Sequence, residues 1–389
     1  MRYNFDHTLD HRANHSYRWT QPEGRNDIIG MGTADMDFAC PPCIRQTAQQ
    51  ICNENTFNYR AKPDHYYNSL TGWYRRRYGL EISRDWLTNI PATLGAIRFL
   101  IGHFAKAGDR VIMQTPHFSP LQRAIEASGC ELILNPLHLT DGRYELDLED
   151  FEQKIKEHRP AMYILVNPHN PTGRAFTQEE LDRMISICYE NHVLVLSDEV
   201  HCLITYGEEN HIPLLALSDK ARNIGIQVMA MSKGFNTMGL PHAIIMIADP
   251  KMQKSWTDYI LPFDFYYASN AYALSAFTAI TDGLADDWLA DVTGYLEGNL
   301  DLFCREVLRR NLPIRPLRPE AGYLLWIDCR DSGLDQDHLA DAFLAKAGIS
   351  LADGLEFGEA GRGFVRMNFA VTRETLLAVI DRLERMFLY

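Results

Sequence analysis

Three polar residues in the middle of the chain are of types that could carry out chemistry together. They are Asn170, Asp198 and Lys233, and each comes just after an apolar run that is typical of a strand. In open α/β sheets, ligands bind beyond the carboxyl ends of the strands. We therefore expect the amide, the carboxylate and the amine to meet in one site.

A lysine in such a site suits covalent chemistry with carbonyl compounds. Removal from water and neighbouring charge lower the pKa of the amine of Lys233, which frees its lone pair to form a Schiff base. Asp198 suits a complementary role, because a carboxylate facing a pyridine nitrogen keeps the ring protonated and able to accept electrons. Taken singly, such residues are often turn, cap or surface residues. Their joint order and spacing favour a site.

The elements that must position these residues form an alternating pattern. Apolar runs typical of parallel strands covered on both faces alternate with amphipathic stretches, of which 177–191 is the clearest helix because Thr177 and Glu180 form a capping box. The predicted strands are Arg110–Gln114, Glu131–Asn135, Met162–Val166, Val193–Ser197, Ile226–Ala230 and Ala243–Ala248. The pattern predicts an α/β domain with a mainly parallel, doubly wound sheet.

The last third of the chain has a different pattern. After Gly283 a long helical region reaches about Arg310. Short strands follow at Gly322–Asp328 and Phe364–Phe369, and a helix begins at Thr372, which together predict a smaller α+β unit. Because the first 40 residues contain no long periodic element, they are expected to form an arm. We predict a large domain at 45–283 and a small domain made of 1–44 and 284–389.

Composition excludes several other classes of protein. With 38 Lys and Arg against 51 Asp and Glu, the 389-residue chain has a net charge of −13, which argues against nucleic acid as a partner. No apolar stretch approaches the roughly 20 residues of a membrane helix, and the N-terminus lacks the apolar core of a signal peptide. Eight scattered cysteines indicate neither a disulfide scaffold nor a zinc site. We expect a cytoplasmic protein without a metal or a membrane partner.

The joint pattern resembles a known superfamily over nearly the whole chain. Asn167–Gly173, Ser197–His201 and Ser232–Lys233 are similar to the cofactor segments of fold-type I pyridoxal 5′-phosphate (PLP) enzymes, the aminotransferase class I/II superfamily. Within it, His201 and three further segments resemble the MalY/PatB branch of cystathionine β-lyases (C–S lyases): Ala34–Phe38, Ser232–Asn236 and Val365–Phe369. The resemblance implies PLP as cofactor and an aspartate aminotransferase-like fold, with a large PLP-binding domain and a smaller α+β domain.

The resemblance also implies a role for each matching residue. Lys233 becomes the Schiff-base lysine, Asp198 the partner of the pyridine nitrogen, and Asn170 the donor to the phenolic oxygen. Arg366 becomes the group that binds the substrate α-carboxylate, which its planar guanidinium can grip with two hydrogen bonds. His201 stands where many aminotransferases have Tyr.

Other positions are implied to hold the cofactor. Backbone N–H groups of Thr93 and Leu94, before a helix predicted at Ala96–Ala107, would bind the phosphate together with Ser232. Phe118 falls where the family stacks an aromatic ring on the cofactor. Tyr59 matches a tyrosine that reaches the phosphate of the neighbouring subunit, which implies a homodimer with shared active sites.

Three positions depart from the family pattern. Phe118 replaces a frequent Tyr, Ala230 replaces a phosphate-binding Ser, and Pro241 replaces a phosphate-binding Arg. One possible acid or base is thereby lost. Phosphate binding must rely on Ser232, the helix start and the neighbouring chain.

The leading hypothesis is α,β-elimination from a β-thio-substituted amino acid, such as cystathionine or a cysteine S-conjugate, to thiol, pyruvate and ammonia. Lys233 would remove the Cα proton. An aminotransferase using the same site is the nearest alternative. The departures also leave open a redirected chemistry, such as decarboxylation or oxidative deamination of a sulfur-containing amino acid. A different class of function, that of a regulatory or binding protein, is disfavoured. Such a protein would not need Asn170, Asp198, Lys233 and Arg366 merely to present a surface.

Overall fold

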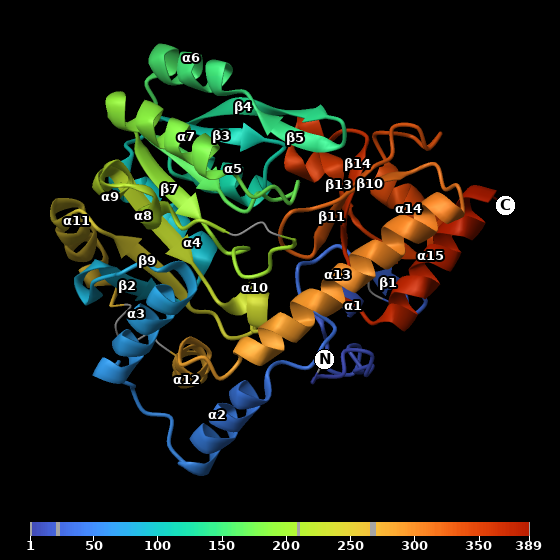
Figure 1. Ribbon diagram of the computed structural model, residues 1–389, viewed down its shortest axis with the longest axis horizontal. Coiled ribbons are helices and arrows are strands. Elements are labelled where there is room, and N and C mark those ends of the chain that lie inside the picture. The colour runs from blue at the N-terminus through green and yellow to red at the C-terminus, as the bar shows by residue number, and fades with distance from the viewer. Residues whose placement is uncertain (1, 21–23, 208–210, 265–269, 389) are drawn as a thin grey trace.

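A computed structural model describes residues 2–20, 24–207, 211–264 and 270–388, which fold around a large and a small β-sheet (Figure 1). The large sheet has eight strands, in the spatial order β2 (Leu87–Ile90), β9 (Ala243–Ile247), β8 (Gly225–Met229), β7 (Leu194–Asp198), β6 (Met162–Val166), β3 (Arg110–Thr115), β4 (Glu131–Thr140) and β5 (Arg143–Leu146). The five strands from β8 to β4 run parallel, whereas β9, β2 and β5 pair antiparallel with their neighbours. The prediction of a mainly parallel sheet is confirmed.

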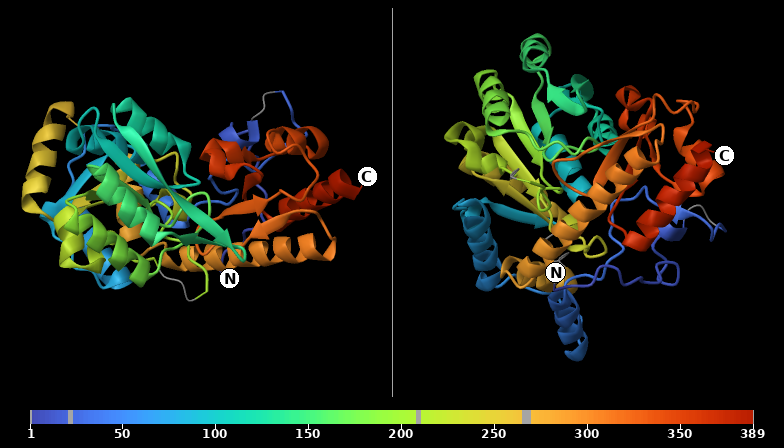
Figure 2. Two further views of the ribbon diagram at one scale, coloured as in Figure 1. Left: turned by 90° about the horizontal axis from the view of Figure 1, so that it is seen from above. Right: turned by 45° about the vertical axis from the view of Figure 1, so that its right-hand side comes forward.

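Helices cover both faces of this sheet, as the two turned views in Figure 2 show. Buried side chains of α4 (Thr93–Phe104), α5 (Ser119–Ala127) and α11 (Pro250–Ile260) pack in one cluster with the sheet. A second cluster contains residues of α6 (Leu148–His158), α7 (Gln178–Glu190), α8 (Leu214–Leu217) and α9 (Asp219–Ile224). Strands buried on both faces are expected to be mainly apolar, which is why β6 and β9 are continuous apolar runs. β8 is apolar except for Gln227, whose buried side chain is hydrogen-bonded to Leu215 and Tyr74.

The predicted elements agree with the structure to within one or two residues at most ends. The capping box of Thr177 and Glu180 is present. The strand predicted at 131–135 continues to Thr140, and the helix predicted to begin at Ala96 begins at Thr93 and ends at Phe104. The last correction matters for the site, because it places two predicted phosphate ligands in the first turn of α4.

A smaller antiparallel sheet lies towards the C-terminus. Its order is β10 (Arg315–Leu317), β11 (Leu324–Asp328), β14 (Phe364–Asn368) and β13 (Ala352–Asp353). Helices α14 (Leu339–Ala347) and α15 (Arg373–Leu388) accompany it, and α13 (Asp286–Arg309) runs as one long helix from beside α10 (Ser232–Phe235) towards this sheet (Figure 1). This arrangement is the smaller α+β unit expected from the sequence.

The N-terminal arm joins this smaller unit. After α1 (Tyr17–Thr20), the short strand β1 (Ile29–Gly30) pairs in parallel with β12 (Ile349–Ser350). The remaining helices are α2 (Pro42–Asn53), α3 (Asp64–Tyr78) and α12 (Ala271–Thr281). The exact domain boundaries at 44/45 and 283/284 stay predictions.

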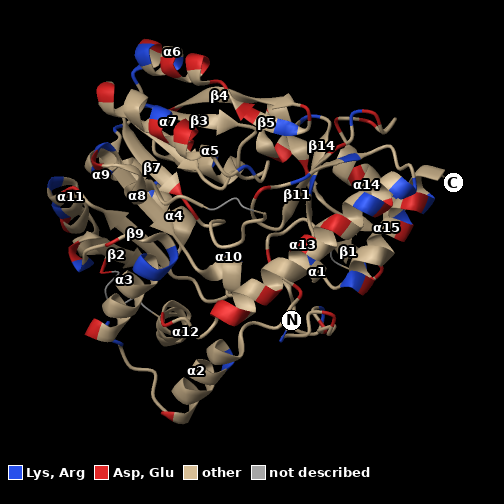
Figure 3. Cartoon of the chain, viewed as in Figure 1, with Lys and Arg blue, Asp and Glu red and all other residues tan. Residues whose placement is uncertain are grey.

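Charged residues lie mainly along the outer helices, and both signs occur on α6 and α15 (Figure 3). Such mixed surfaces are solvated and do not form a single basic face. Among the described residues, no helix has both the length and the apolar character needed to cross a membrane.

Candidate active site

The predicted convergence at the strand ends is present in the structure. Strands β6, β7 and β8 are parallel neighbours, so their carboxyl ends lie at one edge of the large sheet. Asn170 follows β6, Asp198 ends β7, and Lys233 lies in the short helix α10 that follows β8. All three line one cavity of about 520 Å³, and Arg366 enters the same cavity from β14 of the small sheet.

Nine of the ten residues predicted for the site line this cavity: Thr93, Leu94, Phe118, Asn170, Asp198, His201, Ser232, Lys233 and Arg366. Tyr59 is the exception. It is 79% exposed and lies outside the cavity of its own chain. The structure therefore brings together every predicted site residue except the one that was assigned to a neighbouring subunit.

Lys233 is held by close packing and by a backbone acceptor. A Cβ atom at Gly234 would lie 2.4 Å from Cδ1 of Leu203, so only glycine lets α10 approach this closely. The Nζ atom of Lys233 donates a hydrogen bond to the carbonyl oxygen of Ala34 at 2.7 Å. Removal from water, and then the nearby charge of Arg366, lowers the pKa of Lys233 to about 8. At neutral pH a far larger share of this amine is uncharged than of an exposed lysine.

Asp198 is the last residue of β7, and successive side chains of a strand point to opposite faces of the sheet. Its carboxylate lines the cavity and accepts a hydrogen bond from the N–H of Val200 at 3.3 Å. Burial raises the pKa of Asp198 to about 6. Glu199, the next residue, points away from the cavity and pairs with His211 at 2.9 Å. Asp198 alone of this carboxylate pair can therefore face a ligand.

Arg366 reaches the cavity from the small sheet and is held by two acceptors. Its Nη1 atom donates to Oδ1 of Asn170 at 3.0 Å, and its Nη2 atom donates to the carbonyl oxygen of Gly32 at 2.8 Å. Its buried Nε atom has no hydrogen-bond partner among the described residues. Burial lowers the pKa of Arg366 to about 10, so the guanidinium is charged at neutral pH. The contact also orients Asn170, whose Nδ2 amide is left as its donor group.

His201 and Phe118 complete the walls of the cavity. Removal from water, reinforced by the charges of Lys233 and Arg366, lowers the pKa of His201 to about 3. The imidazole is therefore neutral, so one ring nitrogen donates a hydrogen bond and the other accepts one. Phe118 offers an aromatic ring without a phenol.

The donor set fits the cofactor that the sequence resemblance implies. Thr93 and Leu94 are the first two residues of α4, and Ala92 provides no side-chain cap, so the first N–H groups of this helix are available to an anion. Ser232 lines the same cavity. PLP requires donors for its phosphate, a carboxylate for its pyridine nitrogen and a lysine for its aldehyde. The start of α4, Asp198 and Lys233 provide these three.

Several residues of the cavity were not assigned to the site from the sequence. They are Tyr17, Arg18, Gly32, Thr33, Ala34, Val166, Val200, Ser350, Leu351, Ala352 and Glu356. Most belong to the N-terminal arm or to the segment after β12. The only sequence signal for the arm was the segment Ala34–Phe38, which resembles the C–S lyase branch.

Comparisons with known proteins agree with this geometry. Residues 26–383 match the family model described as Aminotransferase class I and II. Cystathionine beta-lyase PatB of Bacillus subtilis (strain 168) is 31% identical over 386 residues, which cover 98% of this chain and 99% of PatB.

Two solved structures extend the match to three dimensions. A PLP-bound protein from Clostridium difficile 630, described as an aminotransferase, has a TM-score of 0.95 at 33% identity, covering 99% of this chain and 100% of its own. The PLP-bound C–S lyase from Staphylococcus hominis has a TM-score of 0.91 at 27% identity, covering 100% and 99%. With its sheet order, its cavity and a family match over most of its length, this chain belongs to the aminotransferase class I and II family.

Proposed function

We propose that the protein is a PLP-dependent C–S lyase. It would act by α,β-elimination on a β-thio-substituted amino acid, such as cystathionine or a cysteine S-conjugate, and release a thiol, pyruvate and ammonia. The observation that carries the proposal is one cavity that holds a lysine with a lowered pKa, a buried carboxylate and an arginine. The names of PatB and of the Staphylococcus hominis enzyme support the same class of reaction.

Four residues of the cavity have tasks that follow from their chemistry. When bound, PLP supplies an aldehyde for the substrate amine and a ring that accepts the electron pair released at Cα. Arg366 binds the α-carboxylate through charge-assisted hydrogen bonds, which orients the substrate. Lys233, once its amine is uncharged, takes the proton from Cα. Asp198 holds the proton on the pyridine nitrogen, and Asn170 donates to the phenolic oxygen.

The direct test uses L-cystathionine and the PLP-loaded protein without any keto acid. We expect pyruvate and ammonia to appear in equal amounts, because elimination needs no amine acceptor. Pyruvate is measured with lactate dehydrogenase and NADH. Ammonia is measured with glutamate dehydrogenase in a separate sample after the protein has been removed, because that assay contains 2-oxoglutarate. Amine transfer to added 2-oxoglutarate, without pyruvate release in its absence, would instead identify an aminotransferase and overturn the proposal.

We further propose that the active protein is a homodimer with shared active sites. Tyr59 is 79% exposed, and Phe57 and Leu261 are each 74% exposed. Large exposed apolar side chains of this kind are typical of surfaces that a partner covers. The adjoining helix α2 also projects from the body of the chain (Figure 1).

A cytoplasmic location is proposed as well, because all eight cysteines are free thiols.

A mixing experiment tests the shared site. Tyr59→Ala is expected to weaken PLP binding about tenfold or more, because a hydrogen bond to a charged phosphate is lost. When Tyr59→Ala and Lys233→Ala subunits are coexpressed, each mixed dimer has one site with both residues intact. Random pairing should then restore about a quarter of the wild-type activity at limiting PLP.

The control is to mix the two separately purified homodimers without subunit exchange, which should restore nothing. If coexpression also restores no activity although mixed dimers are isolated, Tyr59 does not serve the site of the neighbouring subunit.

A further inference from the structure

Both cations of the site contact one segment of the N-terminal arm, residues 32–38, here called the site strap. The carbonyl oxygen of Gly32 accepts from Nη2 of Arg366 at 2.8 Å. Two residues further, the carbonyl oxygen of Ala34 accepts from Nζ of Lys233 at 2.7 Å. The strap thus connects a cation of the large-sheet unit with a cation of the small sheet.

An asparagine close to each cation holds the same strap. Asn368 lies two residues after Arg366, and its Nδ2 atom donates to the carbonyl oxygens of Thr33 and Asp35, each at 2.6 Å. These two carbonyls flank that of Ala34. Asn368 is fully buried, and its Oδ1 atom accepts from the N–H of Ala370 at 2.7 Å, so the orientation of its amide is determined.

The second asparagine, Asn236, lies three residues after Lys233. Its Nδ2 atom donates to the carbonyl oxygens of Met36 at 3.0 Å and Phe38 at 2.7 Å. Its Oδ1 atom accepts from the N–H of Met36 at 3.1 Å. Each cation therefore has an asparagine two or three residues further along the chain that binds the strap contacted by both cations.

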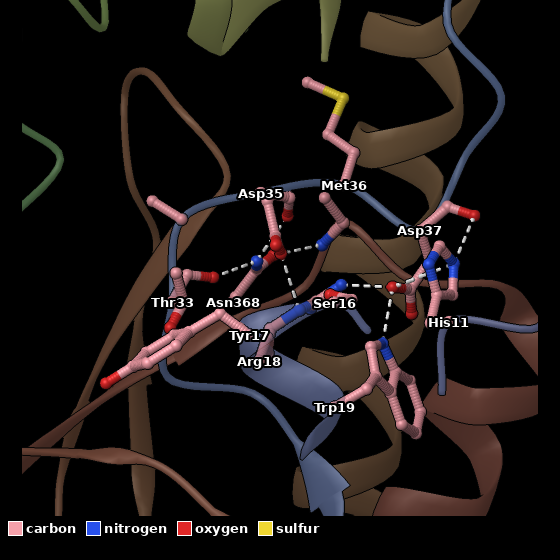
Figure 4. A network of polar contacts seen from close by, with 12 residues as sticks. His11, Ser16, Tyr17, Arg18, Trp19, Thr33, Asp35, Met36, Asp37 and Asn368 are labelled. Atoms are coloured by element: carbon pink, nitrogen blue, oxygen red, sulfur yellow. Dashed lines mark hydrogen bonds and ion pairs between the residues drawn. The ribbon is translucent and has the colours of Figure 1, made fainter. Parts of the chain in front are cut away.

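A polar network from the N-terminal arm also holds the strap (Figure 4). The Nε atom of Arg18 lies 2.6 Å from Oδ1 of Asp35, and its Nη2 atom contacts Asp37. Trp19 donates from Nε1 to Asp37 at 2.8 Å. With both of its acidic side chains paired and its carbonyls bound, the strap has little freedom to move.

We infer that Asn236 and Asn368 are positioning residues, which act on the reaction by aligning the carbonyls of Gly32 and Ala34 with Arg366 and Lys233. The carbonyl of Ala34 receives an N–H of the Lys233 amine whenever that amine is not covalently bound. This contact holds the amine at the wall of the cavity, ready to exchange a proton with the substrate. Since a shift of about 1 Å at a reacting group can cost 10²-fold in rate, the strap sets the spacing between base and carboxylate receptor.

The inference rests on the proposed function only for the identity of the reaction, and its test has a readout that needs no turnover. The test variant is Asn368→Ala, with Asn299→Ala as the matched control. Asn299 is also fully buried and donates to the carbonyls of Phe369 at 3.2 Å and Val371 at 2.8 Å, beside the same strand end, but its hydrogen bonds do not reach the strap. The two variants remove the same chemical group from neighbouring places.

Two quantities are compared after thermal unfolding has shown both variants to be folded. The first is the dissociation constant of 2-aminoisobutyrate, an amino acid that has no Cα proton to lose. Its binding is monitored through the visible absorption of the PLP-loaded protein. The second is the pair kcat and KM for the amino acid that the wild-type protein converts. We expect Asn368→Ala to bind 2-aminoisobutyrate about tenfold more weakly and to lose about tenfold or more in kcat/KM. Asn299→Ala should stay within about twofold of wild type in both quantities, even where its melting temperature falls as far.

Asn236→Ala tests the same idea from the lysine side and serves if Asn368→Ala does not fold. It should lower kcat more than it raises KM, because its nearest site cation is the base. Equal effects of the Asn368 and Asn299 variants on binding and on kcat/KM would show a merely structural role and overturn the inference. Failure of elimination alone would not, because binding of 2-aminoisobutyrate is measured independently of the reaction.

Discussion

Replacing Lys233 with alanine is expected to lower kcat by about 10⁴-fold, the upper end of what a positioned proton-transfer group contributes. The Nζ atom of Lys233 is an amine with a pKa lowered to about 8 that lines the cavity shared with Arg366. Without it, the protein loses both the covalent attachment of PLP and the base for the Cα proton. Turnover of cystathionine and the visible absorption of the purified protein are the measurements.

A small primary amine separates these two losses. The truncated side chain leaves space in the cavity, so added methylamine should restore part of the turnover of Lys233→Ala by accepting the proton. It should leave the wild-type rate unchanged. A Lys233→Ala protein that kept both its turnover and its absorption would show that another residue binds the aldehyde and moves the proton.

The convergence of Asn170, Asp198 and Lys233 could be predicted from the sequence because it needs only local information. Each residue follows an apolar run, and the carboxyl ends of parallel strands meet at one edge whatever the details of packing. Arg366 is different. On its own it reads as an ordinary strand arginine, and only the resemblance to the family placed it in the site. Its contact with Gly32 joins residues 334 positions apart.

Several of the residues that were missed, among them Gly32, Thr33 and Ala34, belong to a segment without periodicity. The site strap is neither helix nor strand, and many of its carbonyl oxygens accept hydrogen bonds from side chains, such as those of Asn236, Arg366 and Asn368, instead of forming a regular ladder. Such a segment has no hydrophobic pattern from which its place could be predicted. Long-range polar contacts determine it, and those exist only once both sheets have formed.

The start of α4 shows a local preference that tertiary structure overrides. The helix was predicted to begin at Ala96, and a glycine inside a helix costs about 1 kcal/mol relative to alanine, which disfavours including Gly95. In the structure the helix begins three residues earlier, at Thr93, and buries Ala96, Ile97, Leu100 and Ile101 against the sheet. Burial of these side chains outweighs the cost of the glycine. The result is a helix start that faces the cavity.

Replacing Asp198 with asparagine is expected to lower kcat by about 10²–10³-fold, the usual loss when one preorganised electrostatic group is removed from a site. The amide has nearly the shape of the carboxylate but cannot hold a proton on the pyridine nitrogen by its charge. Burial raises the pKa of Asp198 to about 6. Because Asp198 works only when ionised, wild-type activity should fall as the pH drops through its pKa, which gives the pH profile an acid limb. A cation facing the carboxylate lowers the pKa of Asp198 and moves this acid limb to lower pH. The limb should be absent from the pH profile of Asp198→Asn.

Glu199→Gln is the matched control for Asp198→Asn, since Glu199 is the next residue and is equally buried but does not line the cavity. Its carboxylate accepts from Ser197 and from the N–H of Leu214, each at 2.9 Å, and it pairs with His211. These contacts are structural, so Glu199→Gln should lower the melting temperature and leave kcat within a few-fold of wild type. Equal losses of kcat in both variants would mean that Asp198 stabilises the strand end and does not act on the cofactor ring. A large loss of kcat confined to Asp198→Asn, together with the missing acid limb, would show that the charge of Asp198 acts on the cofactor ring during the reaction.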